Sequence, residues 1–120
     1  MLNNFCVNLT RSIDDPDRAT VAMVVANAAV ASGKQAMVFL SSEGVRLAVK
    51  GVADQISEEG FQPMATLVQN YLAAGGNVWV CSPCFKKRGY AEGDLIEGAT
   101  IVGGAKLVEF LSNDGTGVSY

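Results

Sequence analysis

The residues best suited to covalent chemistry in this sequence are two cysteines separated by one serine and one proline. They are Cys81 and Cys84, and the cations Lys86, Lys87 and Arg88 follow closely. A cysteine reacts as its thiolate, and both nearby cations and the N-terminus of a helix favour that form. Because proline is common in the first turn of a helix, we expect a helix to begin here. Together with the cations, it should lower the pKa of Cys81.

Three kinds of cysteine chemistry fit such a pair. A zinc site needs about four ligands, whereas the chain offers only Cys6, Cys81 and Cys84 and no histidine, so we expect no metal. A dithiol that forms a reversible disulfide is typical of the cysteine-x-proline-cysteine pattern, but no proline follows Pro83, and the thioredoxin fold needs a later one. The third possibility is a thiolate that accepts sulfane sulfur as a persulfide and passes it on.

The other residues offer less chemistry. The lack of histidine excludes Ser-His-Asp and Cys-His catalysis. Cys6 lies between apolar neighbours in a predicted strand and is interpreted as a small buried hydrophobe. Glu43 and the aspartates around residue 15 are interpreted as helix caps and solvated charge. The glycines match neither the dinucleotide-binding fingerprint nor the P-loop, so no cofactor is expected.

The elements that must position the cysteine pair alternate between strand and helix. Apolar runs predict strands at 5–9, 35–41, 77–81, 99–102 and 118–120. Helical spacing and helix-start signals predict helices at 16–32, 63–74, 82–89 and 105–111, while 43–50 is helical or irregular. This alternation predicts one three-layer α/β domain over residues 1–120, with a mainly parallel sheet of about five strands. Ligands of such sheets bind beyond the carboxyl ends of the strands, which is where Cys81 falls.

Composition restricts the class of protein further. The 120 residues are 49% hydrophobic and 18% charged, with a net charge of −3 and a mean hydropathy of +0.24. These values exclude a disordered chain, and the negative charge argues against nucleic acid and anionic membranes as partners. The apolar tract at 19–31 is shorter than the ~20 residues that span a bilayer, and no signal peptide is evident, so we expect a cytoplasmic protein. The low charge indicates a surface buried between subunits.

The segment around the cysteines resembles the DsrE/DsrF-like family of small sulfur-trafficking proteins. It reads NVWVCSPCFKKRG from Asn77 to Gly89; in the family a strand ends in a cysteine and a basic pair precedes a glycine. Three other segments are similar in order and spacing. They are an alanine-rich helix that ends in glycine at 19–34, a strand with glutamate-glycine-valine after it at 35–45, and a closing segment at 94–111.

The resemblance implies a flavodoxin-like subunit that assembles into a homo-trimer or hexamer and handles sulfur as a carrier or transferase. Cys81 falls at the position of the acceptor cysteine, where it would be the nucleophile and persulfide carrier. Cys84 would be a resolving or assisting thiol. The implied partners are sulfur donor and acceptor proteins. Two alternatives stand beside this interpretation: a non-catalytic binding protein of the same fold, and a dithiol-disulfide oxidoreductase that uses Cys81 and Cys84.

Overall fold

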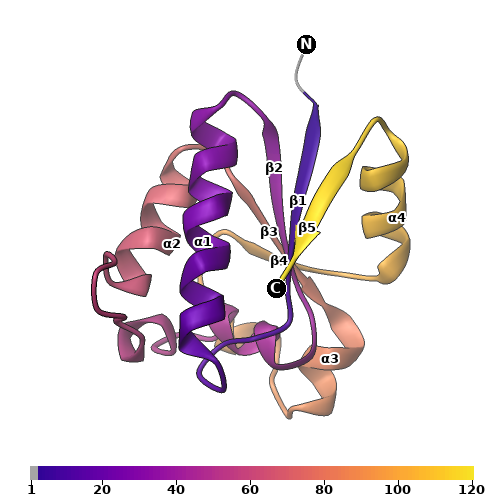
Figure 1. The fold of residues 1–120 in the computed structure, drawn as a ribbon. Coiled ribbons are helices and arrows are strands. Elements are labelled where there is room, and N and C mark those ends of the chain that lie inside the picture. Colours follow the sequence, from indigo (N-terminus) through magenta and orange to yellow (C-terminus); the bar gives the residue numbers. More distant parts are fainter. Residues whose placement is uncertain (1–2) are drawn as a thin grey trace.

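A five-stranded sheet with helices on both faces forms the centre of the molecule (Figure 1). The computed structural model describes residues 3–120. The strands lie in the order β4-β3-β2-β1-β5, and all neighbouring pairs are parallel. The predicted α/β class with a parallel sheet of about five strands is therefore confirmed.

The elements begin and end within about two residues of the predicted positions. The strands are β1 (Asn4–Leu9), β2 (Gln35–Leu40), β3 (Asn77–Cys81), β4 (Ala99–Val102) and β5 (Thr116–Ser119). The helices are α1 (Pro16–Ala31), α2 (Met64–Ala73), α3 (Ser82–Lys87) and α4 (Gly104–Ser112). The segment with no clear prediction forms a 3-10 helix, η1 (Ser42–Ala48), and two short 3-10 turns are η2 (Ala53–Gln55) and η3 (Glu92–Asp94).

Local sequence signals set the ends of α1. The Asp15 carboxylate accepts a hydrogen bond from the backbone N–H of Arg18 at 3.1 Å, as an N-cap does, and Pro16 is the first helical residue. The helix ends before Gly33, whose φ of +79° is a conformation that glycine adopts without strain. The predicted cap and stop signals are therefore confirmed.

The two faces of the sheet are covered unequally. The larger apolar cluster lies between the sheet and the pair α1 and α2. A smaller cluster lies under α4, where Cys6 is fully buried and the ring of Trp79 meets that of Phe110 edge-on at 5.8 Å between centroids. Burial raises the pKa of Cys6 to about 11, so this thiol is a core residue, as predicted.

Apolar side chains stay exposed on the outer faces of two helices. Val24 on α1 is 37% exposed, and Val108 on α4 is 64% exposed. The inner face of α1 packs on the sheet and on α2, while its outer face meets solvent within one chain. Among residues 3–120, no helix is long and apolar enough to cross a membrane.

The turn from β2 into η1 is pressed against the end of β1. The backbone N–H of Ser41 donates to the carbonyl of Leu9 at 3.1 Å, and the N–H of Gly44 donates to the carbonyl of Ser41 at 2.9 Å. A Cβ on Gly44 would overlap the carbonyl oxygen of Leu9. The absence of a side chain at residue 44 therefore permits this close approach.

This close approach predicts that Gly44→Ala destabilises the protein by about 1–3 kcal/mol, the usual cost of forcing extra volume into a packed site. Gly93→Ala is the matched control, since nothing lies within 4 Å of its added Cβ, and it should stay within about 0.5 kcal/mol of the wild type. Urea unfolding of the three proteins measures the difference. Equal stability of Gly44→Ala and Gly93→Ala would contradict the packing argument.

Candidate functional site

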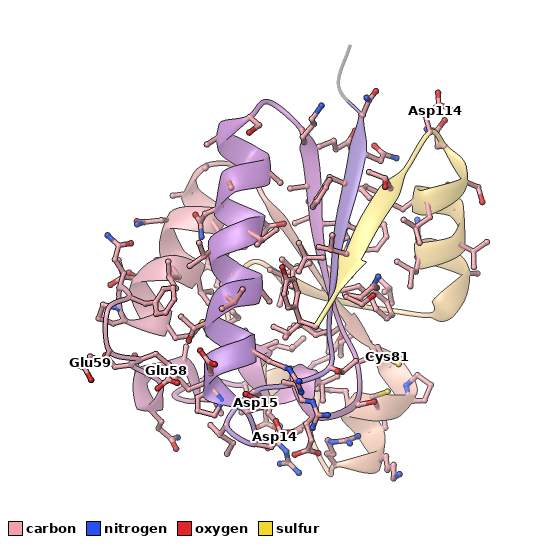
Figure 2. The ribbon with its side chains drawn as sticks, viewed as in Figure 1. Asp14, Asp15, Glu58, Glu59, Cys81 and Asp114 are labelled. Carbon is pink, nitrogen blue, oxygen red and sulfur yellow. The ribbon has the colours of Figure 1, made fainter. Side chains whose placement is uncertain are left out.

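The fold brings Cys81 and Cys84 together at the carboxyl end of the sheet. Cys81 is the last residue of β3, and Cys84 lies in the first turn of α3. Figure 2 shows Cys81 at the same end of the molecule as Asp14 and Asp15, with Asp114 at the opposite end. Both thiols are half-buried and free, and each shifts the pKa of the other. The predicted pair is thus one site, and Cys6 lies outside it.

The two thiols have unequal acidity. Burial raises the pKa of Cys81, and the hydrogen bond that its thiol donates to Cys84 raises it further. Burial acts on Cys84 in the same direction, but the hydrogen bonds from Cys81 and the backbone N–H of Ser42, with the charges of Arg88 and Lys87, outweigh it. The pKa of Cys84 is therefore lowered from its ordinary value.

This result corrects the expectation that the basic run lowers the pKa of Cys81. The charge of Arg88 does favour the Cys81 thiolate, but burial and the hydrogen bond to Cys84 prevail. The charge of Lys87 acts on Cys84 and that of Arg88 on both thiols, while Lys86 is not among the leading causes of either shift. The expectation failed because α3 starts only after Cys81. Cys84, three residues later, therefore lies nearer in the chain to Lys87 and Arg88.

The Ser42 backbone N–H that reaches Cys84 is presented by a strained turn. Ser42 has a φ of 51°, in the left-handed region that is uncommon for a residue with a side chain. The turn is held in place by the packing of Gly44 against the end of β1 and by the hydrogen bond from Ser41 to Leu9. Sequence analysis missed Ser42 because its contribution is a backbone N–H, and no residue type signals that.

Glu43 joins the two segments that form the site. Its carboxylate accepts from Nε of Arg46 at 2.7 Å and from Nε of Arg88 at 2.7 Å. These two hydrogen bonds, that of Arg46 first, hold the pKa of Glu43 below its ordinary value. The interpretation of Glu43 as solvated charge was wrong, because the fold places it between two arginines that are distant in sequence from each other.

The two arginines continue this network toward the cysteines and the following loop. Nη1 of Arg88 donates to the carbonyl of Cys84 at 3.1 Å. Nη1 of Arg46 donates to the hydroxyl of Tyr90 at 2.7 Å, and its guanidinium lies 5.7 Å from the centre of that ring. The Tyr90 ring also packs on Phe85 of α3 at 5.3 Å. The network therefore ties the C-terminal end of α3 to η1 and to the loop that follows.

The main groove of the molecule lies apart from the cysteine pair. Within residues 3–120, no three histidine, cysteine, aspartate or glutamate side chains gather as metal ligands would. A groove of about 440 Å³ lies between α2 and the η2 segment, and it is lined by Lys50, Asp54, Leu72 and Ile96 among others. None of its lining residues belongs to the cysteine pair or the basic run. The chemistry of the site is thus that of two thiols in a cationic surrounding.

Comparison with known proteins gives a family and several relatives. The sequence profile of the DsrE/DsrF-like family matches residues 3–118. An uncharacterized protein of Methanocaldococcus jannaschii, MJ0989, is 33% identical over 116 residues, which are 97% of this chain and 98% of that protein. A second protein of that organism, MJ0760, is 29% identical over 108 residues, 90% of this chain but 39% of that protein. The chain thus spans about two-fifths of MJ0760.

Solved structures share the fold at low sequence identity. The YchN protein of E. coli superposes with a TM-score of 0.79 at 22% identity and covers 100% of both chains. The protein MTH1491 of Methanobacterium thermoautotrophicum superposes with a TM-score of 0.72 at 15% identity, covering 98% of this chain and 99% of its own. These likenesses extend to the whole α/β fold.

The unequal acidity of the thiols predicts a specific pattern among charge variants. Arg88→Gln removes a positive charge that favours the Cys84 thiolate, so the pH profile of Cys84 alkylation should move to higher pH and the rate at neutral pH should fall. Lys86→Gln removes the same charge two residues away and should leave the profile in place. Iodoacetamide kinetics followed by peptide mass spectrometry measures each thiol. Equal shifts in both variants would mean that general surface charge, not Arg88, acts on the thiol.

Proposed function

The chain belongs to the DsrE/DsrF-like family, and from this premise we propose that it carries sulfane sulfur as a persulfide on Cys81, with Cys84 as its partner thiol. The family context is one of sulfur relay. The observation that carries the proposal is the pair of free, half-buried thiols at the end of β3 and in the first turn of α3, one of them with a lowered pKa. The pair lies at the strand ends, where α/β sheets present their functional groups.

The chemistry of a persulfide carrier needs only what this site contains. A thiolate attacks the sulfane sulfur of a donor, the donor leaves as a thiol, and a later acceptor thiol removes the sulfur again. Each transfer exchanges one S–S bond for another, so no cofactor or metal takes part. The cations beside the pair favour the thiolate in each step.

The implied partners are proteins that deliver and remove sulfur. The thiols lie on the surface at the rim, and the side chains of Lys86 and Lys87 on α3 are exposed beside them. Cationic side chains around a reactive thiol favour the approach of a partner with an acidic surface. We therefore expect the donor or the acceptor to present acidic residues near its own reactive sulfur.

One observation favours a second candidate, a dithiol-disulfide oxidoreductase. Cys81 and Cys84 lie near enough for each thiol to shift the pKa of the other, and a reversible disulfide also requires two neighbouring cysteines. Such a protein would cycle between dithiol and disulfide at a defined potential. It would not retain an added sulfur atom, so mass spectrometry separates the two functions.

The persulfide proposal predicts that incubation with glutathione persulfide adds one sulfur, about 32 Da, to the intact mass. Iodoacetamide should trap the product on the segment that contains Cys81 and Cys84. The double variant Cys81→Ser/Cys84→Ser should lose the gain entirely. Cys6→Ser is the control, because Cys6 is buried and has a raised pKa, and it should load as the wild type does.

Other outcomes lead to different conclusions. A loss of about 2 Da with no added sulfur would indicate an internal disulfide and favour the oxidoreductase. No change of mass in any protein would favour a non-catalytic binding function on the same fold. Loading that survives in the double variant would place the acceptor outside the cysteine pair.

We also propose that the chain assembles into a homo-trimer or hexamer. Its low charge and the exposed valines on the outer faces of α1 and α4 support the burial of further surface between copies. Light scattering at micromolar concentration should give at least three times the chain mass of 12.6 kDa. A mass of one chain across that range would contradict this assembly and leave the low charge unexplained.

A further inference from the structure

We propose that a second groove, which lies beside α4, binds an uncharged planar heteroaromatic compound of nucleoside size that carries an exocyclic amino group. The groove has a volume of about 390 Å³, which is within the usual range of small-molecule sites. Five of its seven lining residues are polar and two are aromatic. The inference goes beyond the proposed function, because none of these residues belongs to the cysteine pair or to the basic run.

The α4 side of the groove is one face of that helix. The residues that line it are Lys106, Glu109, Phe110 and Asn113, and this spacing places them on one side of an α-helix. Figure 2 shows the next residue, Asp114, at the end of the molecule opposite Cys81. The groove is therefore a separate site from the thiols.

The sheet side of the groove is formed by the amino ends of two strands and the middle of a third. Asn4 of β1 is the register partner of Gln35 of β2, so their side chains lie next to each other on the same face of the sheet. Trp79 of β3 is the third lining residue from the sheet and stays half-buried beside α4. Two carboxamides and an indole ring thus face one side of the helix.

The carboxamide of Asn4 has an acceptor that the protein itself does not use. Asn4 is only 8% exposed, and its Nδ2 donates to the carbonyl of Phe110 at 2.8 Å. Within residues 3–120, the only fully enclosed side-chain nitrogen or oxygen that lacks a partner is Oγ of Ser12, and no group there donates to Oδ1 of Asn4. This oxygen is therefore reached from the groove. Because an unpaired acceptor in a buried residue is costly, a ligand N–H is favoured at this atom.

The two aromatic residues favour a flat ring as the body of the ligand. The rings of Trp79 and Phe110 meet at an angle of 74°, with 5.8 Å between their centroids. A planar ring that lies flat on one of them meets the other edge-on, and these are the two arrangements that aromatic rings prefer. Stacking of a nucleobase on an aromatic side chain is a general source of affinity.

The charges of the groove favour a neutral ligand. Lys106 and Glu109 have opposite charges, so an anionic group that is attracted by one is repelled by the other. The carboxamides of Gln35 and Asn113 can each donate and accept hydrogen bonds, as sugar hydroxyls require. Charged residues are depleted at the centre of protein interfaces, so this lining suits a small molecule better than a second copy of the chain.

The test uses adenosine as the probe and Trp79 as the reporter. Trp79 is the only tryptophan of the chain, so a change in its fluorescence reports directly on the groove. Titration of the full chain with adenosine should give a saturable change with a Kd of about 1 mM or tighter, and calorimetry should give the same Kd. Purine riboside lacks the amino group and should bind about three- to tenfold more weakly. AMP should bind no more tightly than adenosine.

Variants show whether Asn4 is the group that recognises the amino group. Asn4→Ala should bind adenosine about three- to tenfold more weakly, and it should no longer distinguish adenosine from purine riboside. Asn70→Ala is the matched control, because Asn70 is exposed on α2 outside the groove, and it should bind as the wild type does. Circular dichroism checks that Asn4→Ala is folded. The comparison of the two nucleosides on the wild type does not depend on that variant.

Three results would overturn the proposed site. They are the absence of both a fluorescence change and heat up to the solubility limit of adenosine, equal affinity of the wild type for adenosine and purine riboside, and an unchanged preference for adenosine in folded Asn4→Ala. Lack of binding together with a fall to the mass of one chain in Lys106→Glu would show instead that a second copy fills the groove. None of these measurements involves persulfide loading, so the site and the proposed function can fail separately.

Discussion

The carboxylate of Glu43 between Arg46 and Arg88 is the interaction on which the site depends. A parallel sheet brings the ends of β2 and β3 side by side, but it does not fix how the segments beyond those ends meet. Glu43 does so, because one carboxylate oxygen binds each arginine at 2.7 Å. Partly exposed ion pairs typically contribute less than about 1 kcal/mol to stability. The ion pair of Glu43 with Arg88 therefore matters mainly for position. It holds α3, and with it Cys84, next to the turn that contains Ser42.

That turn has its own constraint from the core. Gly44 can approach Leu9 only because it lacks a side chain, and the approach bends the chain so that Ser42 takes a positive φ. Backbone strain at a functional residue persists when the surrounding structure determines it. Here two contacts hold Ser42 in this conformation: the packing of Gly44 on Leu9 and the ion pair of Glu43 with Arg88. The three residues 43–45 thus act together. Glu43 binds Arg88 at the end of α3, Gly44 packs on the end of β1, and Val45 is fully buried.

The sequence predicts the elements well and the site only in part. Apolar runs, the cap at Asp15 and the stop at Gly33 are local signals, so strands and helices could be placed from them. The pairing of Cys81 with Cys84 could be predicted for the same reason, since three residues separate them at the start of a helix. The ion pair between Glu43 and Arg88, and the donor at Ser42, join segments about 40 residues apart. They depend on the tertiary arrangement, which residue types alone do not reveal.

The unequal pair resolves a conflict that a single thiol would face. A thiol that loads readily must be an available anion, and an acidic thiol is also a good leaving group that gives the sulfur up easily. One cysteine cannot both load readily and hold its sulfur firmly. In this site burial raises the pKa of both thiols and the charge of Arg88 opposes it at both, but the opposing groups prevail only at Cys84. The boundary between strand and helix therefore places two thiols of different acidity within three residues.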